Sequence, residues 1–557
     1  MENSKINRDD LTAKQLGPDG RSQYAVFLPA LSGFYGTYVG KQRFGNYVDP
    51  ARIPTDFETG IEGLNWLNPD EGYFPYKWAL YSAGHAELDT TKISPKEDMV
   101  RNRDRSRSFI LGDSGGFQIG KGVWEGDWKD PACPKAQKKR ELVLAWMDAY
   151  MDRGMCLDIP AWVARSPAGR KATGINTYLE AVEGTYINND YFMKNRTGAC
   201  KFLNVLQGET HADADDWYDR MKKYCDPTQY ERPFEGWAMG GQNMCDVDLV
   251  LRRIVAMKFD GLLEKGLHDW MHFLGTSKLE WACLLTDIQR AVRKHHNADF
   301  TISFDCASPF LASANGQIYI QTETEDRGKW TYRMKPSVDN KKYSLDTRPF
   351  RTGLLADGIF KIFTESPVSA RIKMNDICVY HGGVRKTVAE LGGEKFDVTN
   401  QSHYSVPPAL NKINKVGKTS WDSFAYAIQM GHNVWSHLTS VQEANRQYDA
   451  GIIPKMLVQE KHDRVYFRDV ADEIFAAKTR EEANAIIKHH NKFWQAIPGT
   501  RGNIGKKTVN PNTFFDIHFE EVATDMPEEV IYHLDDSGLD ETNLNNLEME
   551  IENEDGI

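Results

Sequence analysis

The sequence has no long apolar run and no closely paired cysteines, and both absences narrow the class of protein. No apolar stretch approaches the ~20 residues that a membrane-spanning helix requires. The first residues, Met1 to Lys5, lack the apolar core of a secretion signal. Eight cysteines are scattered over 557 residues without a C-x-x-C pair, which is typical of reduced thiols and not of a disulfide scaffold or a zinc ribbon. We therefore expect a cytoplasmic protein that does not contact a membrane.

Lys and Arg are absent beyond Lys507, whereas fifteen Asp and Glu residues lie between Asp516 and Asp555. The formal net charge of the whole chain is −11, and without these fifteen negative charges the rest of the chain has a net charge of +4. A basic footprint for nucleic acid on the body of the protein is therefore compatible with the overall acidity. Because the tail also has few aromatic residues, we expect residues 516–557 to be acidic and weakly ordered.

Two apolar runs in the chain end at an aspartate that is followed by small residues. The first runs from Phe109 to Asp113 and continues as Ser-Gly-Gly, and the second runs from Thr301 to Asp305 and continues as Cys-Ala-Ser. Each pattern predicts a strand that delivers a carboxylate into a tight loop, where backbone comes close to another group. Active sites at strand ends are built in this way.

The same pattern of a short apolar run ending in polar or glycine residues repeats along the chain, with helix-like stretches between the runs. Further strands are predicted at 24–30, 155–157, 202–206, 236–239 and 272–274. Amphipathic segments are predicted at 212–224, 247–257 and 279–295. This alternation favours an α/β fold, a (β/α)₈ barrel whose active site gathers at the carboxyl ends of its strands. A doubly wound sheet would give the same alternation, so periodicity alone leaves that alternative open.

The length permits more than one core, because a single core stops growing near ~250–300 residues. We expect one large domain with additions. Residues 1–22 form a polar, frayed segment, and residues 23–450 form the barrel, with a hairpin-rich insertion near 317–350. A helical extension over 451–515 precedes the acidic tail. Within the barrel domain, the glycine- and tyrosine-rich stretch 32–47 is expected to form loops and a hairpin.

Paired aspartates at strand ends suit substitution at an anomeric carbon, where one carboxylate attacks and the other manages a proton. Asp158 and Gln207 add a carboxylate and an amide that can read the edge of a purine, and exposed backbone at Gly240 and Gly241 can supply a further donor or acceptor. Phe117 could stack on a flat base. For each residue the ordinary alternative is a helix cap or a turn, so the functional interpretation depends on their joint occurrence.

These residues also carry a resemblance to a known family. Asp113-Ser114-Gly115-Gly116-Phe117-Gln118 resembles the D-S-G-G-[FY]-Q signature of the tRNA-guanine transglycosylases. Further matches follow in the family's order, and these are Asp158, Leu206-Gln207-Gly208, Ala238-Met239-Gly240-Gly241, Phe304-Asp305-Cys306 with Asn315-Gly316, and a weaker echo at His432-Asn433. The signature and the first four of these further matches make five ordered matches over residues 105–320, which together are more specific than any one of them.

The resemblance implies a barrel enzyme that exchanges guanine for a 7-deazaguanine base, of the type that carries a nitrile group. It implies that Asp305 is the nucleophile, which forms a covalent intermediate with C1′ of the sugar, and that Asp113 is the general acid and base. Reaching the target would require the nucleotide to be flipped out of its stack. The implied base-binding residues are Ser114, Phe117, Asp158, Gln207, Gly240, Gly241 and Leu274.

The sequence departs from the family at its structural zinc site. The family uses C-x-C-x-x-C and a later His, whereas this chain offers only Cys378 and His381. One thiolate and one imidazole cannot complete a tetrahedral structural site, so we expect no zinc and no other cofactor. Loss of that site, with the insertions and the extended C-terminal region, resembles the DNA-modifying branch of the family, the DNA 7-deazaguanine transglycosylases of bacteriophages and bacterial DNA-modification clusters.

The expected partners are therefore DNA and a free 7-deazaguanine base, in the host cytoplasm if a phage encodes the protein. A homodimer is compatible with the sequence. The nearest alternative is a divergent tRNA-guanine transglycosylase with tRNA as the partner. An alternative of another class is a non-catalytic nucleic-acid-binding subunit, although such a subunit has no need of both Asp113 and Asp305. A glycosidase on the same barrel would place Trp124, Trp128 or Trp162 near the carboxylates.

Overall fold

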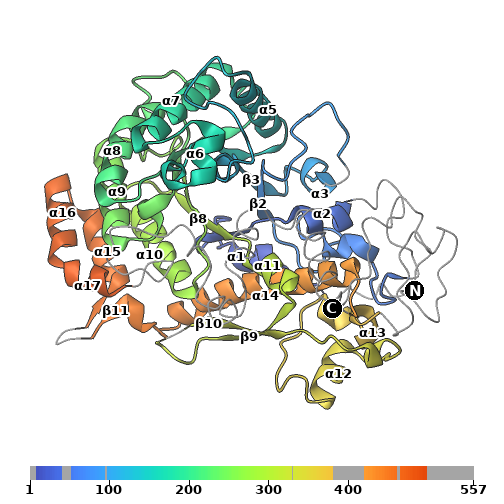
Figure 1. The fold of residues 1–557 in the computed structure, drawn as a ribbon. Helices are drawn as coiled ribbons and strands as arrows, with labels where there is room; N and C mark the ends of the chain where they lie inside the picture. The colour runs from blue at the N-terminus through green and yellow to red at the C-terminus, as the bar shows by residue number, and fades with distance from the viewer. Residues whose placement is uncertain are drawn as a thin grey trace.

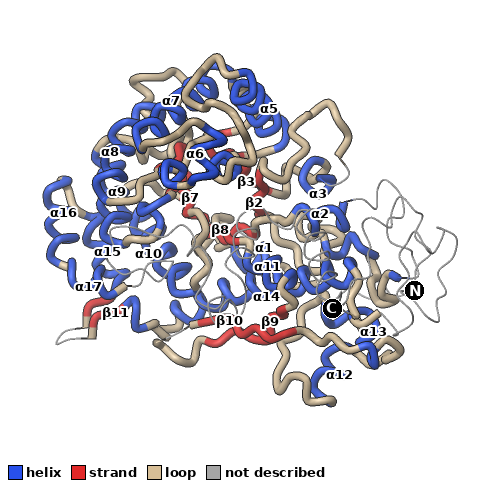
Figure 2. The backbone as a smooth tube through the Cα atoms, viewed as in Figure 1, coloured by secondary structure: helices blue, strands red, loops and turns tan. Residues whose placement is uncertain are grey.

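The computed structural model describes residues 8–40, 52–94, 97–328, 330–379, 420–460 and 464–497. Its centre is one parallel sheet of eight strands, in the order β1-β8-β7-β6-β5-β4-β3-β2, curved into a nearly closed barrel (Figure 2). The strands are β1 (Val26–Pro29), β2 (Trp78–Ser82), β3 (Phe109–Asp113), β4 (Arg153–Met155), β5 (Lys201–Leu206), β6 (Trp237–Met239), β7 (Trp270–Phe273) and β8 (Thr301–Cys306). The fold is therefore the predicted (β/α)₈ barrel and not a doubly wound sheet.

Strands β1 and β2 are the two ends of this sheet, and they meet at a single bridge between Ala30 and Leu80. In this bridge the Leu31 amide donates to the Leu80 carbonyl oxygen over 2.9 Å. Every other junction in the barrel has at least two paired positions. The β1–β2 seam is thus the least hydrogen-bonded junction of the barrel.

Helices follow the strands, and the longer ones cover the outside of the barrel, whereas α4 lies at the pocket end (Figure 1). They include α2 (Gly33–Gly40), α3 (Asp98–Arg101), α4 (Gly116–Gly120), α5 (Pro134–Tyr150), α6 (Pro167–Thr173), α7 (Tyr178–Asn195), α8 (His211–Met221), α9 (Val247–Phe259), α10 (Leu279–His295) and α11 (Ser308–Ala314). The start of α8 is fixed by a capping box, in which the Thr210 hydroxyl accepts from the Asp213 amide and the Asp213 carboxylate accepts from the Thr210 amide. Helix α10 is buried on most of its sides, between the barrel and the helices α14 and α15, and its buried residues include Trp281, Leu285 and Ile288.

Beyond β8 the chain forms an antiparallel hairpin and then a long helix. The hairpin consists of β9 (Gln317–Glu323) and β10 (Thr331–Pro336), and the helix α14 (Ser423–Asp449) packs against α11 and β9. The Asn433 side chain joins these parts, because its amide donates to the Gln317 carbonyl oxygen and the Ser313 hydroxyl while its oxygen accepts from the Tyr319 amide. Two short helices, α12 (Phe350–Ala356) and α13 (Met374–Ile377), lie between hairpin and α14 in the chain.

The C-terminal helices α15 (Phe467–Ala476), α16 (Arg480–His489) and α17 (Asn491–Ala496) stack beside α9 and α10, on the outside of the barrel (Figure 1). A short antiparallel pair, β11 (Val458–Gln459) and β12 (Val465–Tyr466), precedes them. The Lys258 ammonium group on α9 donates to the Phe475 carbonyl oxygen over 2.7 Å and so ties the extension to the barrel. The predicted acidic tail, residues 516–557, lies outside the described residues.

Two local expectations were wrong. Residues 8–22 are not frayed, because α1 (Leu11–Gln15) buries Leu11 completely and the Gln442 amide donates to the Leu11 carbonyl oxygen. The stretch that begins at residue 32 contains the helix α2 instead of loops, although its glycines disfavour helix. Burial of Tyr35 and Val39 outweighs that local preference. None of the helices in the described part of the chain is long and apolar enough to cross a membrane.

Candidate active site

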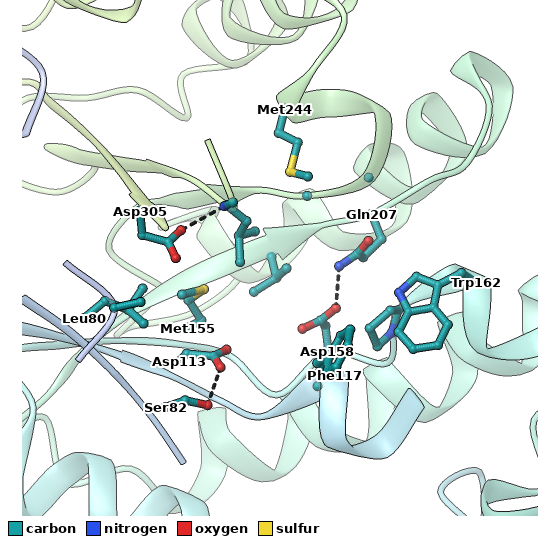
Figure 3. A pocket seen from close by; sticks show the side chains of 18 of the residues that line it. Leu80, Ser82, Asp113, Phe117, Met155, Asp158, Trp162, Gln207, Met244 and Asp305 are labelled. Atoms are coloured by element: carbon teal, nitrogen blue, oxygen red, sulfur yellow. Dashed lines mark hydrogen bonds between the residues drawn. The ribbon is translucent and has the colours of Figure 1, made fainter. Parts of the chain in front are cut away.

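A pocket opens at the carboxyl ends of the strands and brings together most of the predicted site residues (Figure 3). Its internal volume of about 110 Å³ is several times what one water molecule requires. The predicted residues that line it are Asp113, Phe117, Asp158, Gln207, Gly240, Gly241, Leu274 and Asp305. Ser114 is buried but does not line the pocket.

Asp113 ends β3 and points into the pocket beside Ser82, the last residue of β2 (Figure 3). The Ser82 hydroxyl donates to Asp113 Oδ2 over 2.6 Å, and the Gly115 amide donates weakly to Oδ1 over 3.4 Å. Burial raises the pKa of Asp113, and the nearby Asp305 raises it further, although both donors oppose the shift. Asp113 is thus suited to holding and transferring a proton.

Asp158 follows β4 and forms a pair with Gln207, which follows β5. The Gln207 amide nitrogen donates to Asp158 Oδ2 over 2.8 Å (Figure 3). Burial raises the pKa of Asp158 to about 7, and the Asp113 carboxylate contributes to the shift. Gly116 allows the carboxylate this position, since a Cβ at residue 116 would lie 2.9 Å from Asp158 Oδ1. Carboxylate and amide together form one polar edge of the pocket.

Small residues and flat side chains shape the remaining walls. Gly241 has φ of +54°, and a Cβ there would lie 2.3 Å from the Gly208 carbonyl oxygen, so glycine allows the two neighbouring loops to touch. The Phe117 ring lies 5.6 Å from the Trp162 ring with the planes inclined at 60°. Leu274 follows β7 and lines the same pocket. The pocket therefore combines a polar edge with apolar and aromatic faces, which suits a flat heterocycle.

Asp305 lies on β8, and His272 and the Gly275 amide hold its carboxylate in place. His272 Nε2 lies 3.1 Å from Asp305 Oδ1, and the Gly275 amide donates to the same oxygen over 2.9 Å. Gly275 has φ of +60°, a conformation that glycine adopts without strain. Only 7% of Asp305 is exposed, and that part faces the pocket.

Several pocket residues were not predicted as site residues. Ser82 belongs to β2, the one barrel strand that was missed, although its run Trp-Ala-Leu-Tyr-Ser has the same form as the others. His272 was predicted to lie in a strand, but its contact with Asp305 crosses to a neighbouring strand and could not be read from spacing. Of the tryptophans considered for a glycosidase, Trp162 alone lines the pocket, whereas Trp128 is fully buried.

Within the described residues, no group of three or more His, Cys, Asp or Glu side chains is arranged to hold a metal ion. Cys378 is buried and its thiol donates to the Val338 carbonyl oxygen. His381, the other predicted remnant of a zinc site, lies outside the described residues.

Comparison with protein-family models and with curated proteins finds no match for this chain. The fold alone does not determine the reaction, since (β/α)₈ barrels carry many chemistries.

Replacing Asp158 with Asn should stabilise the protein. The wild-type carboxyl is ionised in the unfolded chain above pH ~4, but in the folded protein only above about 7. Folding takes up a proton between these values, so stability falls as pH rises through that window. Asn avoids this penalty and can still accept from Gln207. We expect urea unfolding at pH 8 to give a free energy of unfolding about 2–4 kcal/mol higher than wild type, with a smaller gain at pH 5.

Asp219→Asn is a suitable control, because the Asp219 side chain is 68% exposed and, among the described residues, pairs with Lys222 at the surface. Its effect should stay within about 0.5 kcal/mol at both pH values. Equal stability of wild type and Asp158→Asn at pH 8 would show that Asp158 carries no burial penalty.

Proposed function

We propose that the protein is a guanine transglycosylase that exchanges guanine in DNA for a 7-deazaguanine base through a covalent aspartyl intermediate. The observation that carries the proposal is the placing of Asp113, Asp158 and Asp305 around one pocket that also contains Gln207 and Phe117. These are the residues that the sequence resemblance assigns to the reaction.

The proposed reaction has two displacements at C1′ of the target sugar. Asp305 forms a bond from a carboxylate oxygen to C1′ while the glycosidic C1′–N9 bond breaks, and Asp113 gives its proton to the departing guanine. The incoming base then loses its N9 proton to Asp113 and forms a bond from N9 to C1′, while the ester bond to Asp305 breaks. Two inversions retain the configuration at C1′, and Asp113 regains the proton it gave. The raised pKa of Asp113 supports the role of proton carrier.

The pair of Asp158 and Gln207 is suited to reading a guanine-like base. An ionised Asp158 can accept from N1–H and from the exocyclic amine, while the amide of Gln207 has a second hydrogen for the base's O6. Adenine would turn the unprotonated N1 toward the carboxylate and would be rejected. Phe117 and Leu274 can cover the two faces of the ring. A 7-deazaguanine presents the same edge as guanine, which suits both the leaving and the entering base.

DNA is preferred to tRNA because the sequence offers only one of the cysteines that form the structural zinc site of the tRNA enzymes. Radiolabelled guanine should therefore be incorporated by the purified protein into double-stranded DNA and not into total tRNA. Each substrate is precipitated and counted after incubation, in parallel reactions. A duplex that contains only A·T pairs is the matched substrate control, since it offers no guanine to exchange.

The outcomes of this assay are separable. Label in DNA that unlabelled 7-deazaguanine displaces supports the proposal. Label in tRNA alone would make the protein an unusual member of the tRNA branch, and label in neither would exclude guanine exchange. Asp305→Asn serves as the blank for both substrates.

A further inference from the structure

A column of polar side chains runs up the inside of the barrel between β7 and β8, where apolar packing is usual. Trp270 and His272 are two residues apart on β7, and Ser303 and Asp305 are two residues apart on β8. Residues at this spacing share a face of the strand, and all four point to the barrel interior. His272 lies opposite Ser303 in the parallel register. Both side chains are completely buried. Burying such groups is costly unless every donor and acceptor is satisfied.

The column forms an unbroken chain of hydrogen bonds that ends at Asp305. The Trp270 indole N–H donates to Ser303 Oγ over 2.8 Å, and Ser303 Oγ lies 2.9 Å from His272 Nδ1. His272 Nε2 then lies 3.1 Å from Asp305 Oδ1. At the base of the column the Trp270 ring stacks across the barrel on Phe109, with centroids 4.5 Å apart. This stacking fixes the position of Trp270, the first residue in the series of hydrogen bonds that ends at Asp305.

The direction of these bonds fixes the tautomer of His272. An indole nitrogen can only donate, so Ser303 Oγ must accept from Trp270. Among the described residues, the acceptor in reach of the Ser303 hydroxyl proton is His272 Nδ1. With Nδ1 accepting, the imidazole proton is on Nε2 and is directed at Asp305.

The described residues donate hydrogen bonds to one carboxylate oxygen of Asp305. His272 and the Gly275 amide both contact Oδ1, and no described residue donates to Oδ2. We infer that His272 is the positioning residue for the proposed nucleophile, in that it and Gly275 anchor Oδ1 and leave Oδ2 as the oxygen that attacks C1′. The inference rests on the proposed function and adds to it the group that orients the carboxylate.

His272→Phe removes the donor but keeps a flat ring of similar size. We expect covalent adduct formation with DNA to slow on the order of 10²-fold, while the concentration of free base for half-maximal exchange stays unchanged because the base-reading residues are untouched. His272→Gln, whose amide can again donate to Asp305, should restore most of the rate. Rates are measured by quenching in denaturant and separating the protein–DNA adduct on gels.

His268→Phe is the matched control. His268 is also completely buried and lies just before β7, but its ring contacts the Cys225 carbonyl oxygen and the Glu264 amide at the opposite end of the barrel. It should lower thermal stability about as much as His272→Phe and leave the adduct rate of the folded protein unchanged. A purely structural role of His272 predicts equal rates for the two variants.

The tautomer is tested separately, in the free protein. Nitrogen chemical shifts of ¹⁵N-labelled histidine, with His272 assigned by comparison with His272→Phe, should show Nε2 protonated and Nδ1 unprotonated. A proton on Nδ1, or equal adduct rates for wild type and His272→Phe, would overturn the inference. Absence of any adduct with wild-type protein on DNA and on tRNA would instead overturn the proposed function itself.

Discussion

Asp305→Asn is expected to abolish the covalent adduct with DNA and to reduce guanine exchange by on the order of 10³-fold or more, as loss of a nucleophile does in other covalent enzymes. An amide oxygen can still accept from the Gly275 N–H, so the pocket should stay intact. The side chain would lack the negative charge that attacks C1′. Adduct formation is measured on denaturing gels with end-labelled duplex DNA, and exchange by incorporation of labelled guanine.

Asp299→Asn is the matched control, because Asp299 lies just before β8 at the opposite end of the barrel from the pocket. Its carboxylate pairs with Arg21 at the surface, where such pairs contribute little. This variant should form the adduct at the wild-type rate. An adduct retained by Asp305→Asn would mean that another side chain is the nucleophile.

Asp113→Asn should slow the formation of the adduct by about 10²–10⁴-fold, the usual contribution of a general acid. The amide cannot supply a proton to the departing guanine, although its oxygen can still accept from the Ser82 hydroxyl. The defect should shrink when the target base is 7-methylguanine, which already carries a positive charge and departs without being protonated. The pocket should admit the methyl group, because the proposed 7-deazaguanines carry a substituent at the same position.

The ratio of adduct rates for 7-methylguanine and guanine, compared between Asp113→Asn and wild type, measures this effect. Asp104→Asn, a change in the loop before β3, should leave the ratio at its wild-type value, because Asp104 is exposed and its carboxylate accepts from Ser106 in the same loop. An equal loss for both bases in Asp113→Asn would remove Asp113 from proton transfer and give it a structural role.

The barrel could be predicted because each strand carries its own local signal. The predicted strands occur in the structure with bounds that differ by at most two residues. The missed strand, β2, ends in Ser82 and not in a carboxylate or a glycine pair, so it did not stand out. Helix α2 was missed for the opposite reason, since its glycines favour loops locally and only the burial of Tyr35 in the assembled core favours the helix.

Within the site, the sequence predicted the residues that a local pattern marks. It did not predict the contacts that form between strands. Asp113 ends β3, whereas Asp158 and Gln207 follow β4 and β5, and the carboxyl ends of parallel strands meet at one edge. The pairing of Gln207 with Asp158 and the contact of His272 with Asp305 depend on the register between neighbouring strands, which spacing along the chain does not specify. Raised pKa values likewise arise only when the barrel closes around the carboxyls.

The β1–β2 seam makes one side of the barrel easier to open than the others. Seven junctions join the eight strands in an unbroken ladder, and the eighth is held by the bridge between Ala30 and Leu80. Both of these residues, with Leu31, also form one wall of the pocket. Local opening costs least where the fewest hydrogen bonds are broken. The wall beside Ser82 and Asp113 is therefore the compliant side of the site, while the β7–β8 side that holds Asp305 is the rigid one.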